Sequence, residues 1–144
     1  MKLYKVLIAV TLSSVCLVGI AAEGKWTKGY GQGNLEFFID KGNARLSLAC
    51  PSQESNNGGY ADVTLLVNNK DVRSFKIQAG EVNLNGPFTT STRGGENSFI
   101  SLINNLHKTD AKVTYGTNTF VFPKSNVTSV LPTYMSGKLN CAFN

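Results

Sequence analysis

The residues that could carry chemistry are few, and the sequence holds a single histidine, His107. Hydrolases with a serine or cysteine nucleophile need a base beside it, and histidine is the usual one. His107 follows Leu106 at the boundary of a predicted apolar helix face, and Asp110 lies three residues further on. Asp110 could cap the local backbone as easily as it could orient an imidazole. We therefore expect His107 to be a surface residue near a helix end.

Carboxylates offer a second chemistry, because two of them can hydrolyse a glycosidic bond when an apolar neighbourhood raises the pKa of one. On the predicted strands, every acid that follows residue 22 falls in a turn or at an outward position. No acid is expected in an apolar neighbourhood, so we expect no catalytic pair, no cofactor and no enzymatic activity. The acids considered are Glu23, Glu36, Asp40, Glu54, Asp62, Asp71, Glu81, Glu96 and Asp110.

Two further patterns resemble ligand sites without the features that such sites need. The run from Gly29 to Gly33 is as rich in glycine as a phosphate-binding loop, but no strand precedes it and its glycine spacing differs. We expect residues 23–33 to be a flexible leader that docks through Trp26. Lysines and arginines after residue 22 are scattered, whereas nucleic-acid binding needs them in clusters, so no nucleic-acid partner is expected.

Binding is the function predicted for two polar loops, at residues 51–59 and 86–96. Tyr60, Phe88 and Arg93 lie in or beside these loops. Loops on a rigid scaffold often carry function, and tyrosine and arginine are enriched where binding energy concentrates. We therefore predict that these three residues bind a partner. The alternative is that they are partly buried anchors of ordinary loops.

The cysteine count predicts one structural crosslink. Of the three cysteines, Cys16 falls in the predicted export signal, and Cys50 and Cys141 remain. An even number of cysteines in an exported domain indicates a disulfide, so we predict a bond between Cys50 and Cys141. The alternatives are a reactive thiol or a metal site. Two cysteines and one histidine fall short of four zinc ligands, so no metal is expected.

The first 22 residues have the layout of a secretory signal peptide. Lys2 and Lys5 give a positive start, an uncharged apolar run covers Val6 to Ile20, and small residues end at Ala22. The apolar run is shorter than the ~20 residues that span a bilayer. We therefore expect cleavage after Ala22 and no stable membrane span. The signal has a bacterial character, and the mature domain is predicted to be periplasmic or secreted.

Length and composition are those of one globular domain, predicted to cover residues 23–144. The chain has 144 residues, of which 42% are apolar and 10% aromatic, and this is enough for a packed core. Only 16% are charged, below the ~25% of an average soluble protein, and the aromatic content argues against disorder. The formal charge of +5 includes the two lysines of the signal, so the mature domain is less basic than the whole chain.

The hydrophobic pattern predicts a mainly β domain of the α+β class. Apolar and polar residues alternate from Ala44 to Cys50, which is typical of a half-buried strand and places Cys50 on the core face. We expect six to eight short strands, joined by hairpins into an antiparallel sandwich or a curved sheet. Besides residues 44–50, the expected strands cover residues 34–40, 60–67, 72–77, 81–85, 111–115, 119–122 and 139–143.

One amphipathic helix is predicted near residues 97–108. Its apolar side chains recur with helical spacing, and Asn97 or Ser98 is the expected N-cap. One or two further helical turns are possible at residues 125–131. The apolar residues of the main helix are Phe99, Leu102, Ile103 and Leu106.

These features together predict a small exported binding protein of the bacterial envelope, without enzymatic activity and of inhibitor or immunity type. Its partner would be another protein or an envelope component. The alternative is an envelope-structural or surface-assembly subunit, in which residues 23–33 add a strand to the sheet of a neighbour. The sequence leaves the oligomeric state open.

Overall fold

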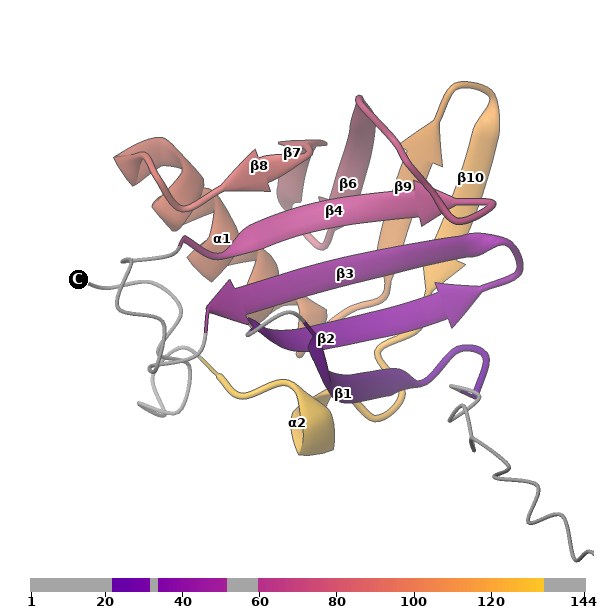
Figure 1. The fold of residues 1–144 in the computed structure, drawn as a ribbon, viewed down its shortest axis with the longest axis horizontal. Coiled ribbons are helices and arrows are strands. Elements are labelled where there is room, and N and C mark those ends of the chain that lie inside the picture. The colour runs from indigo at the N-terminus through magenta and orange to yellow at the C-terminus, as the bar shows by residue number, and fades with distance from the viewer. Residues whose placement is uncertain (1–21, 32–33, 52–59, 134–144) are drawn as a thin grey trace, which may run out of the picture.

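A computed structural model describes residues 22–31, 34–51 and 60–133. Most of the predicted signal peptide, residues 52–59 and the C-terminal segment that holds Cys141 lie outside the described residues. The described chain forms two antiparallel sheets and a helix of 14 residues (Figure 1). The predicted mainly β fold of the α+β class is confirmed, with ten strands in place of the expected six to eight.

The first sheet, sheet A, has the strand order β1-β2-β3-β4-β5, and β8 also pairs with β4. Its strands are β1 (Trp26–Gly31), β2 (Asn34–Lys41), β3 (Ala44–Pro51), β4 (Asp62–Val67), β5 (Lys70–Asp71) and β8 (Phe88–Thr89). The second sheet, sheet B, has the order β10-β9-β6-β7. Its strands are β6 (Phe75–Ala79), β7 (Val82–Gly86), β9 (Ala111–Tyr115) and β10 (Asn118–Phe122). The helices are α1 (Arg93–Leu106) and α2 (Val127–Val130).

The hydrophobic core lies between the two sheets, whose strands cross steeply, with sheet A in front and sheet B behind in Figure 1. The alternation predicted for residues 44–50 is observed, because Leu46, Leu48 and Cys50 are buried on the core face of β3. Ile77 of sheet B is buried from the other side. Successive side chains of a strand point to opposite faces, so each sheet also has an outer face turned away from this core.

Helix α1 packs against β6, β7 and β8 through its apolar side. The helical spacing of the sequence is confirmed, since the four apolar residues that it singled out are all buried. They are Phe99, Leu102, Ile103 and Leu106.

The helix begins earlier than the sequence pattern indicated. Its first residue is Arg93, and Thr92 is the N-cap, with the Thr92 Oγ1 accepting a hydrogen bond from the Gly95 N–H at 3.1 Å. The prediction of Asn97 or Ser98 as the cap is therefore wrong. Both residues lie inside the helix, which a threonine with extended backbone starts one turn earlier.

The prediction of an exposed loop at residues 86–96 is also wrong, because this segment contains β8 and the first turn of α1. Gly95 lies so close to β8 that a Cβ atom there would overlap the carbonyl oxygen of Thr89. The glycines of this segment indicated a loop, but at Gly95 the missing side chain allows a helix to approach a strand closely.

Residues 23–33 were predicted to be a flexible leader, but within this segment residues 26–31 form β1 at the edge of sheet A. The two glycines of β1 lie under side chains of β2. A Cβ at Gly29 would be 3.4 Å from the Phe38 ring, and a Cβ at Gly31 would be 3.1 Å from the Glu36 Oε1. Glycine in this strand therefore serves close packing, which is a recognised use of glycine within sheets.

The hairpin predicted from residues 60–67 and 72–77 forms only in part. Asn68 and Asn69 turn the chain with φ angles of 53° and 59°, and β5 then pairs with β4 for only two residues. Val72 is buried, and the chain crosses to sheet B, where β6 begins. The two strands that the sequence pattern had paired therefore belong to different sheets.

Candidate functional site

The three predicted binding residues lie near one end of sheet A. Tyr60 is exposed just before β4, Phe88 of β8 is half-buried against the core, and Arg93 is exposed at the first position of α1. Thr90 fixes β8 beside β4, because its Oγ1 accepts a hydrogen bond from the Ala61 N–H and its own N–H donates to the Ala61 carbonyl, both at 2.9 Å. The backbone thus brings the three residues to one region, and their role in binding stays a prediction.

His107 and Asp110 take separate structural positions. His107 is the C-cap residue of α1 and is half-buried, and its Nε2 has no hydrogen-bond partner among the described residues. The Asp110 Oδ1 accepts a hydrogen bond from the Lys124 N–H at 3.0 Å. The carboxylate therefore supports the backbone after β10, which is the local role that was one of the two alternatives for it.

One acid departs from the expectation that none would have a raised pKa. Burial raises the pKa of Asp62, and the negative charges of Glu36 and Asp71 raise it further. Glu36 and Asp62 lie on either side of Ala49 in the strand register, so they share one row on the outer face of sheet A. Within the described ranges, no group of three or more His, Cys, Asp or Glu residues is placed to hold a metal ion.

Cys50 lies on the core face of β3, where the alternation of the sequence placed it, and is 2% exposed. It is not a free thiol in the structure. Cys141 lies outside the described residues, so the bond between these two cysteines stays a prediction.

Sheet B presents a polar surface on the side opposite the core. In β6 the buried Phe75, Ile77 and Ala79 alternate with the exposed Lys76 and Gln78. The partners of Lys76 and Gln78 on β7 and β9 point to the same side, and so do the residues of β10 that lie opposite those of β9. We call this surface the outer face of sheet B, and its residues are Lys76, Gln78, Asn83, Asn85, Lys112, Thr114, Thr119 and Val121.

The strand register arranges six of these polar residues in two rows across β7, β6 and β9. The first row is Asn83, Gln78 and Lys112, and the second row is Asn85, Lys76 and Thr114. Lys76 and Lys112 therefore occupy diagonal positions on adjacent strands, about 7–8 Å apart in an antiparallel sheet. One small ligand can reach both rows at once.

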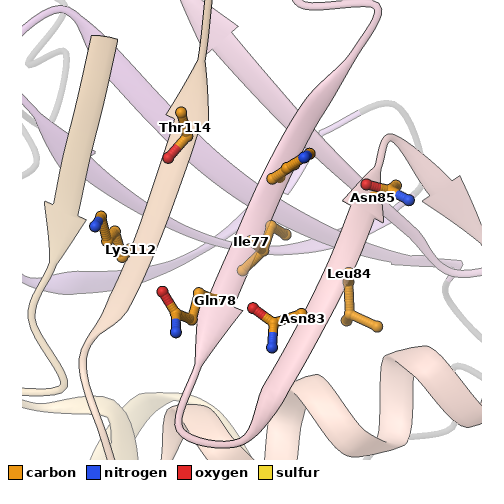
Figure 2. A pocket seen from close by; sticks show the side chains of 8 residues that line it. Ile77, Gln78, Asn83, Leu84, Asn85, Lys112 and Thr114 are labelled. Atoms are coloured by element: carbon orange, nitrogen blue, oxygen red, sulfur yellow. The ribbon is translucent and has the colours of Figure 1, made fainter. Parts of the chain in front are cut away.

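These two rows, together with Ile77 and Leu84, line a shallow hollow of about 330 Å³. Figure 2 shows Lys112 and Thr114 of β9, Gln78 of β6, and Asn83 and Asn85 of β7 gathered around it. A volume near 300 Å³ is at the lower end of the range for small-molecule sites. The hollow is therefore large enough for a sugar-sized group.

The side chains of the two rows remain available for hydrogen bonds to a ligand. Across residues 22–31, 34–51 and 60–133, none of the six makes a hydrogen bond or an ion pair through its side chain. All of them except Thr114 are exposed. Amide side chains both donate and accept hydrogen bonds, and lysine donates three, so this surface can bind a ligand with several oxygen atoms.

A second hollow, of about 340 Å³, lies at the turns that join β2 to β3 and β4 to β5. Four of its polar side chains are already paired with one another. Arg45 donates hydrogen bonds of 2.7 and 2.9 Å to the Asp40 carboxylate, and the Asn43 Nδ2 donates to the Asn68 Oδ1 at 2.9 Å. The outer face of sheet B is the better candidate site, because its groups have no such partners in the described chain.

The outer edge of β1 is another surface with backbone N–H and C=O groups that no other described strand pairs with. Trp26 is buried as predicted, and its N–H donates to the Asn126 Oδ1 at 2.7 Å while the Asn126 Nδ2 donates to its carbonyl at 2.9 Å. The backbone groups of Trp26 therefore point away from β2, and every second residue of an antiparallel strand shares this direction. The backbone groups of Lys28 and Tyr30 thus face the edge of β1 with which no other described strand pairs, and the Tyr30 side chain is 75% exposed.

Sequence reasoning found the strands of sheet B but missed its outer face. The outward residues Lys76 and Gln78 alternate visibly with apolar ones, and so do Asn83 and Asn85. No acid occupies the outward positions of these strands, and this pattern in the sequence could have indicated the outer face of sheet B. The position of Lys112 beside Gln78 was not accessible, because it depends on pairing between strands far apart in the sequence.

Comparisons with known proteins cover all of the described strands and helices. The model of the YfjT family matches residues 24–131. The chain is 28% identical over 97 residues to the uncharacterized protein YfjT of Escherichia coli strain K12, which is 61% of this chain and 63% of the length of YfjT. It is 24% identical over 126 residues to the uncharacterized protein YkfB of the same strain, which is 78% of this chain and 81% of YkfB. No solved structure matches the chain.

Both helices among the described residues are too short or too polar to cross a membrane.

Proposed function

The chain belongs to the YfjT family, and we propose that it is a small binding protein of the bacterial envelope, exported and without enzymatic activity. The observation that carries the proposal is the outer face of sheet B, where six polar side chains from three strands line one hollow and have no partner within the described chain. A ligand that supplies hydrogen bonds to these groups gains affinity and specificity. The partner is an envelope component, or another protein if the domain acts as an inhibitor or immunity factor.

Export of residues 23–144 is the second part of the proposal. The positive start, the apolar run and the small residues that end at Ala22 support a cleaved signal, and the periplasm or the exterior is oxidising enough for a bond between Cys50 and Cys141. The intact mass of protein purified from the envelope fraction tests both claims. We expect the mass of residues 23–144 less two hydrogens. An uncleaved chain would contradict export, and two alkylatable thiols would contradict the bond.

Capture from an envelope extract with matched variants tests the binding surface. The double variant Gln78→Ala with Asn83→Ala removes two amides from the outer face of sheet B. Thr64→Ala changes an outward residue of β4 on the opposite side of the domain and serves as the control. We expect a component that the wild type and the control retain and that the double variant loses. If the double variant retains the same components as the wild type, the outer face of sheet B is not the site.

The open edge of β1 favours one second candidate, a surface-assembly subunit. Because β1 already belongs to its own sheet, it would pair with a neighbour through its free edge and would not leave the domain as a donated strand. Two copies can align antiparallel about Gly29, so that Lys28 of each copy faces Tyr30 of the other. Each such pair exchanges both of its backbone hydrogen bonds, and Gly29 adds no side chain between the strands.

Sedimentation velocity of the purified protein tests assembly through this edge. Tyr30→Pro removes an outward N–H, and proline is tolerated on an edge strand when its nitrogen faces outward. Tyr30→Thr changes the side chain but keeps the N–H. Assembly predicts a dimer for the wild type and for Tyr30→Thr and a monomer for Tyr30→Pro. A wild type that stays monomeric at the highest concentrations measured would remove this candidate.

A further inference from the structure

The charge on the outer face of sheet B is positive and uncompensated. Lys76 and Lys112 occupy diagonal positions on β6 and β9, and like charges in neighbouring positions of a sheet repel each other. The ion pairs of the described chain lie elsewhere, between Lys41 and Glu23 and within the outer face of sheet A. The eight residues of the outer face include no acid. An anionic group between the two ammonium groups would relieve their repulsion.

The neighbours of the two lysines favour an anion carried on a hydroxyl-rich molecule. Gln78 lies directly opposite Lys112, and Asn85 lies directly opposite Lys76. Their amides can donate to one sugar oxygen and accept from another, and Thr114 adds a hydroxyl opposite Lys76 on its other side. Among the outward side chains of this face only Val121 is apolar, and Ile77 and Leu84 are the apolar residues that line the hollow.

We infer that the hollow binds an acidic sugar, one whose carboxylate or phosphate lies between Lys76 and Lys112 and whose hydroxyls bond to the amides of β6 and β7. This inference rests on the proposed function, because it names the ligand of the same surface. Two lysines provide charge for one or two anionic groups, which is far less than a nucleic-acid backbone needs. The hollow of about 330 Å³ holds a sugar unit, whereas a protein partner fits a broader surface.

Isothermal titration calorimetry of the purified protein at low salt tests this inference with three saccharide probes. Trigalacturonate supplies carboxylates, glucose 6-phosphate supplies a phosphate, and maltotriose is a neutral control of similar size to the first. We expect binding of at least one acidic probe and none of maltotriose. High salt should weaken the binding, because the charges are exposed. The stronger of the two acidic probes identifies the source of the anionic group.

Matched lysine variants locate the site. Lys76→Gln and Lys112→Gln should each weaken binding of the acidic probe by about tenfold, since each removes a charge-assisted hydrogen bond. Lys70→Gln changes an exposed lysine of β5 in the other sheet and should leave the affinity unchanged. Equal losses with all three variants would indicate a diffuse charge effect and would overturn the inference.

Three other outcomes separate this inference from the proposed function. If maltotriose binds as tightly as the acidic probes and Gln78→Ala weakens it, the surface binds a ligand but the lysines do not select an anion. If an oligo-aspartate peptide binds more tightly than either sugar, the anion belongs to a protein and the sugar assignment is wrong. If no probe binds while envelope capture still depends on Gln78 and Asn83, the inference fails and the proposed function stands.

Discussion

The outer faces of the two sheets are built in the same way but use their polar groups differently. On the outer face of sheet A, Arg45 donates two hydrogen bonds to Asp40, and its guanidinium lies over the Phe38 ring, 4.2 Å from the ring centroid. On the outer face of sheet B, the side chains of both rows have no partner in the described ranges. The first face pairs Arg45 with Asp40 internally, whereas the two lysines of the second face have no acid to pair with in the described ranges.

The difference originates in which strands meet. Asp40 and Arg45 lie opposite each other on β2 and β3, which one short turn connects, so the sequence supplies both charges within a few residues. Lys76 and Lys112 come together through the pairing of β6 with β9, and neither neighbouring strand contributes an acid. Alternation therefore identifies which side chains face solvent. Whether those side chains can bind a ligand depends on whether they already have hydrogen-bond or ion-pair partners within the protein.

The largest expected effect concerns the crosslink that would hold the C-terminal segment to sheet A. We expect Cys141→Ser to lower the free energy of unfolding by about 2–5 kcal/mol, the range for native disulfides of small secreted domains. Chemical denaturation of the oxidised wild type and of the variant measures it. Because Cys50 is buried in β3, the loss should not affect ligand binding by sheet B. An unchanged free energy of unfolding would show that the bond has no stabilising role.

Two adjacent residues of β6 test the division between core and outer face. Ile77 is 1% exposed, and Ile77→Ala should lower the free energy of unfolding by about 2–5 kcal/mol through a cavity in the core. Gln78 points outward, and Gln78→Ala should change it by less than about 0.5 kcal/mol. Denaturant unfolding of both variants makes the comparison. A large loss for Gln78→Ala would mean that this face is structural.

A smaller effect measures how far sheet A satisfies its own charges. A double-mutant cycle with Arg45→Gln and Asp40→Asn should give a coupling of about 0.5–1 kcal/mol, because their side chains are 43% and 24% exposed and their geometry is bidentate. The matched control is the pair of Lys41 and Glu23, whose Nζ and Oε1 atoms are 3.6 Å apart and whose side chains are 48% and 63% exposed. Its coupling should be about 0–0.3 kcal/mol. Equal coupling energies for the two pairs would show that Arg45 and Asp40 interact no more strongly than an ordinary exposed ion pair.

The smallest effect is a pH dependence on the outer face of sheet A. Burial and the charges of Glu36 and Asp71 raise the pKa of Asp62 above its ordinary value of 3.8. At a pH between 3.8 and the raised pKa, the folded protein binds the Asp62 proton more tightly than the unfolded chain does. The free energy of unfolding therefore falls as the pH rises through this range. Asp62→Asn should therefore stabilise the protein at pH 7.

The gain from Asp62→Asn should disappear at a pH well below 3.8, where the carboxyl is protonated in both the folded and the unfolded state. Glu81→Gln serves as the control, because it removes an exposed acid in the turn that joins β6 and β7. Equilibrium unfolding at the two pH values measures the difference. A gain that is the same at both would mean that ionisation of Asp62 is not its cause.

Much of the fold followed from the sequence because it depends on local periodicity. Period-two alternation identified β3 and placed Cys50 on the core face, and helical spacing identified the buried side of α1. The errors fell on β1, β8 and the first turn of α1, where glycine indicated flexibility. At Gly29 and Gly95 the missing side chain instead permits close packing, and a neighbouring residue that is distant in the sequence creates that requirement.

The sequence by itself thus determined the class of fold, the inward faces of its main strands and helix, and the small number of groups that could do chemistry. The tertiary structure decided the candidate site. Lys112 and Thr114 of β9, Lys76 of β6 and Asn85 of β7 each alternate correctly on their own strands, yet their grouping depends on a register between strands. A register shift of one residue would turn a strand's outward side chains to the core. Packing of both sheets around one core therefore fixes which polar groups meet.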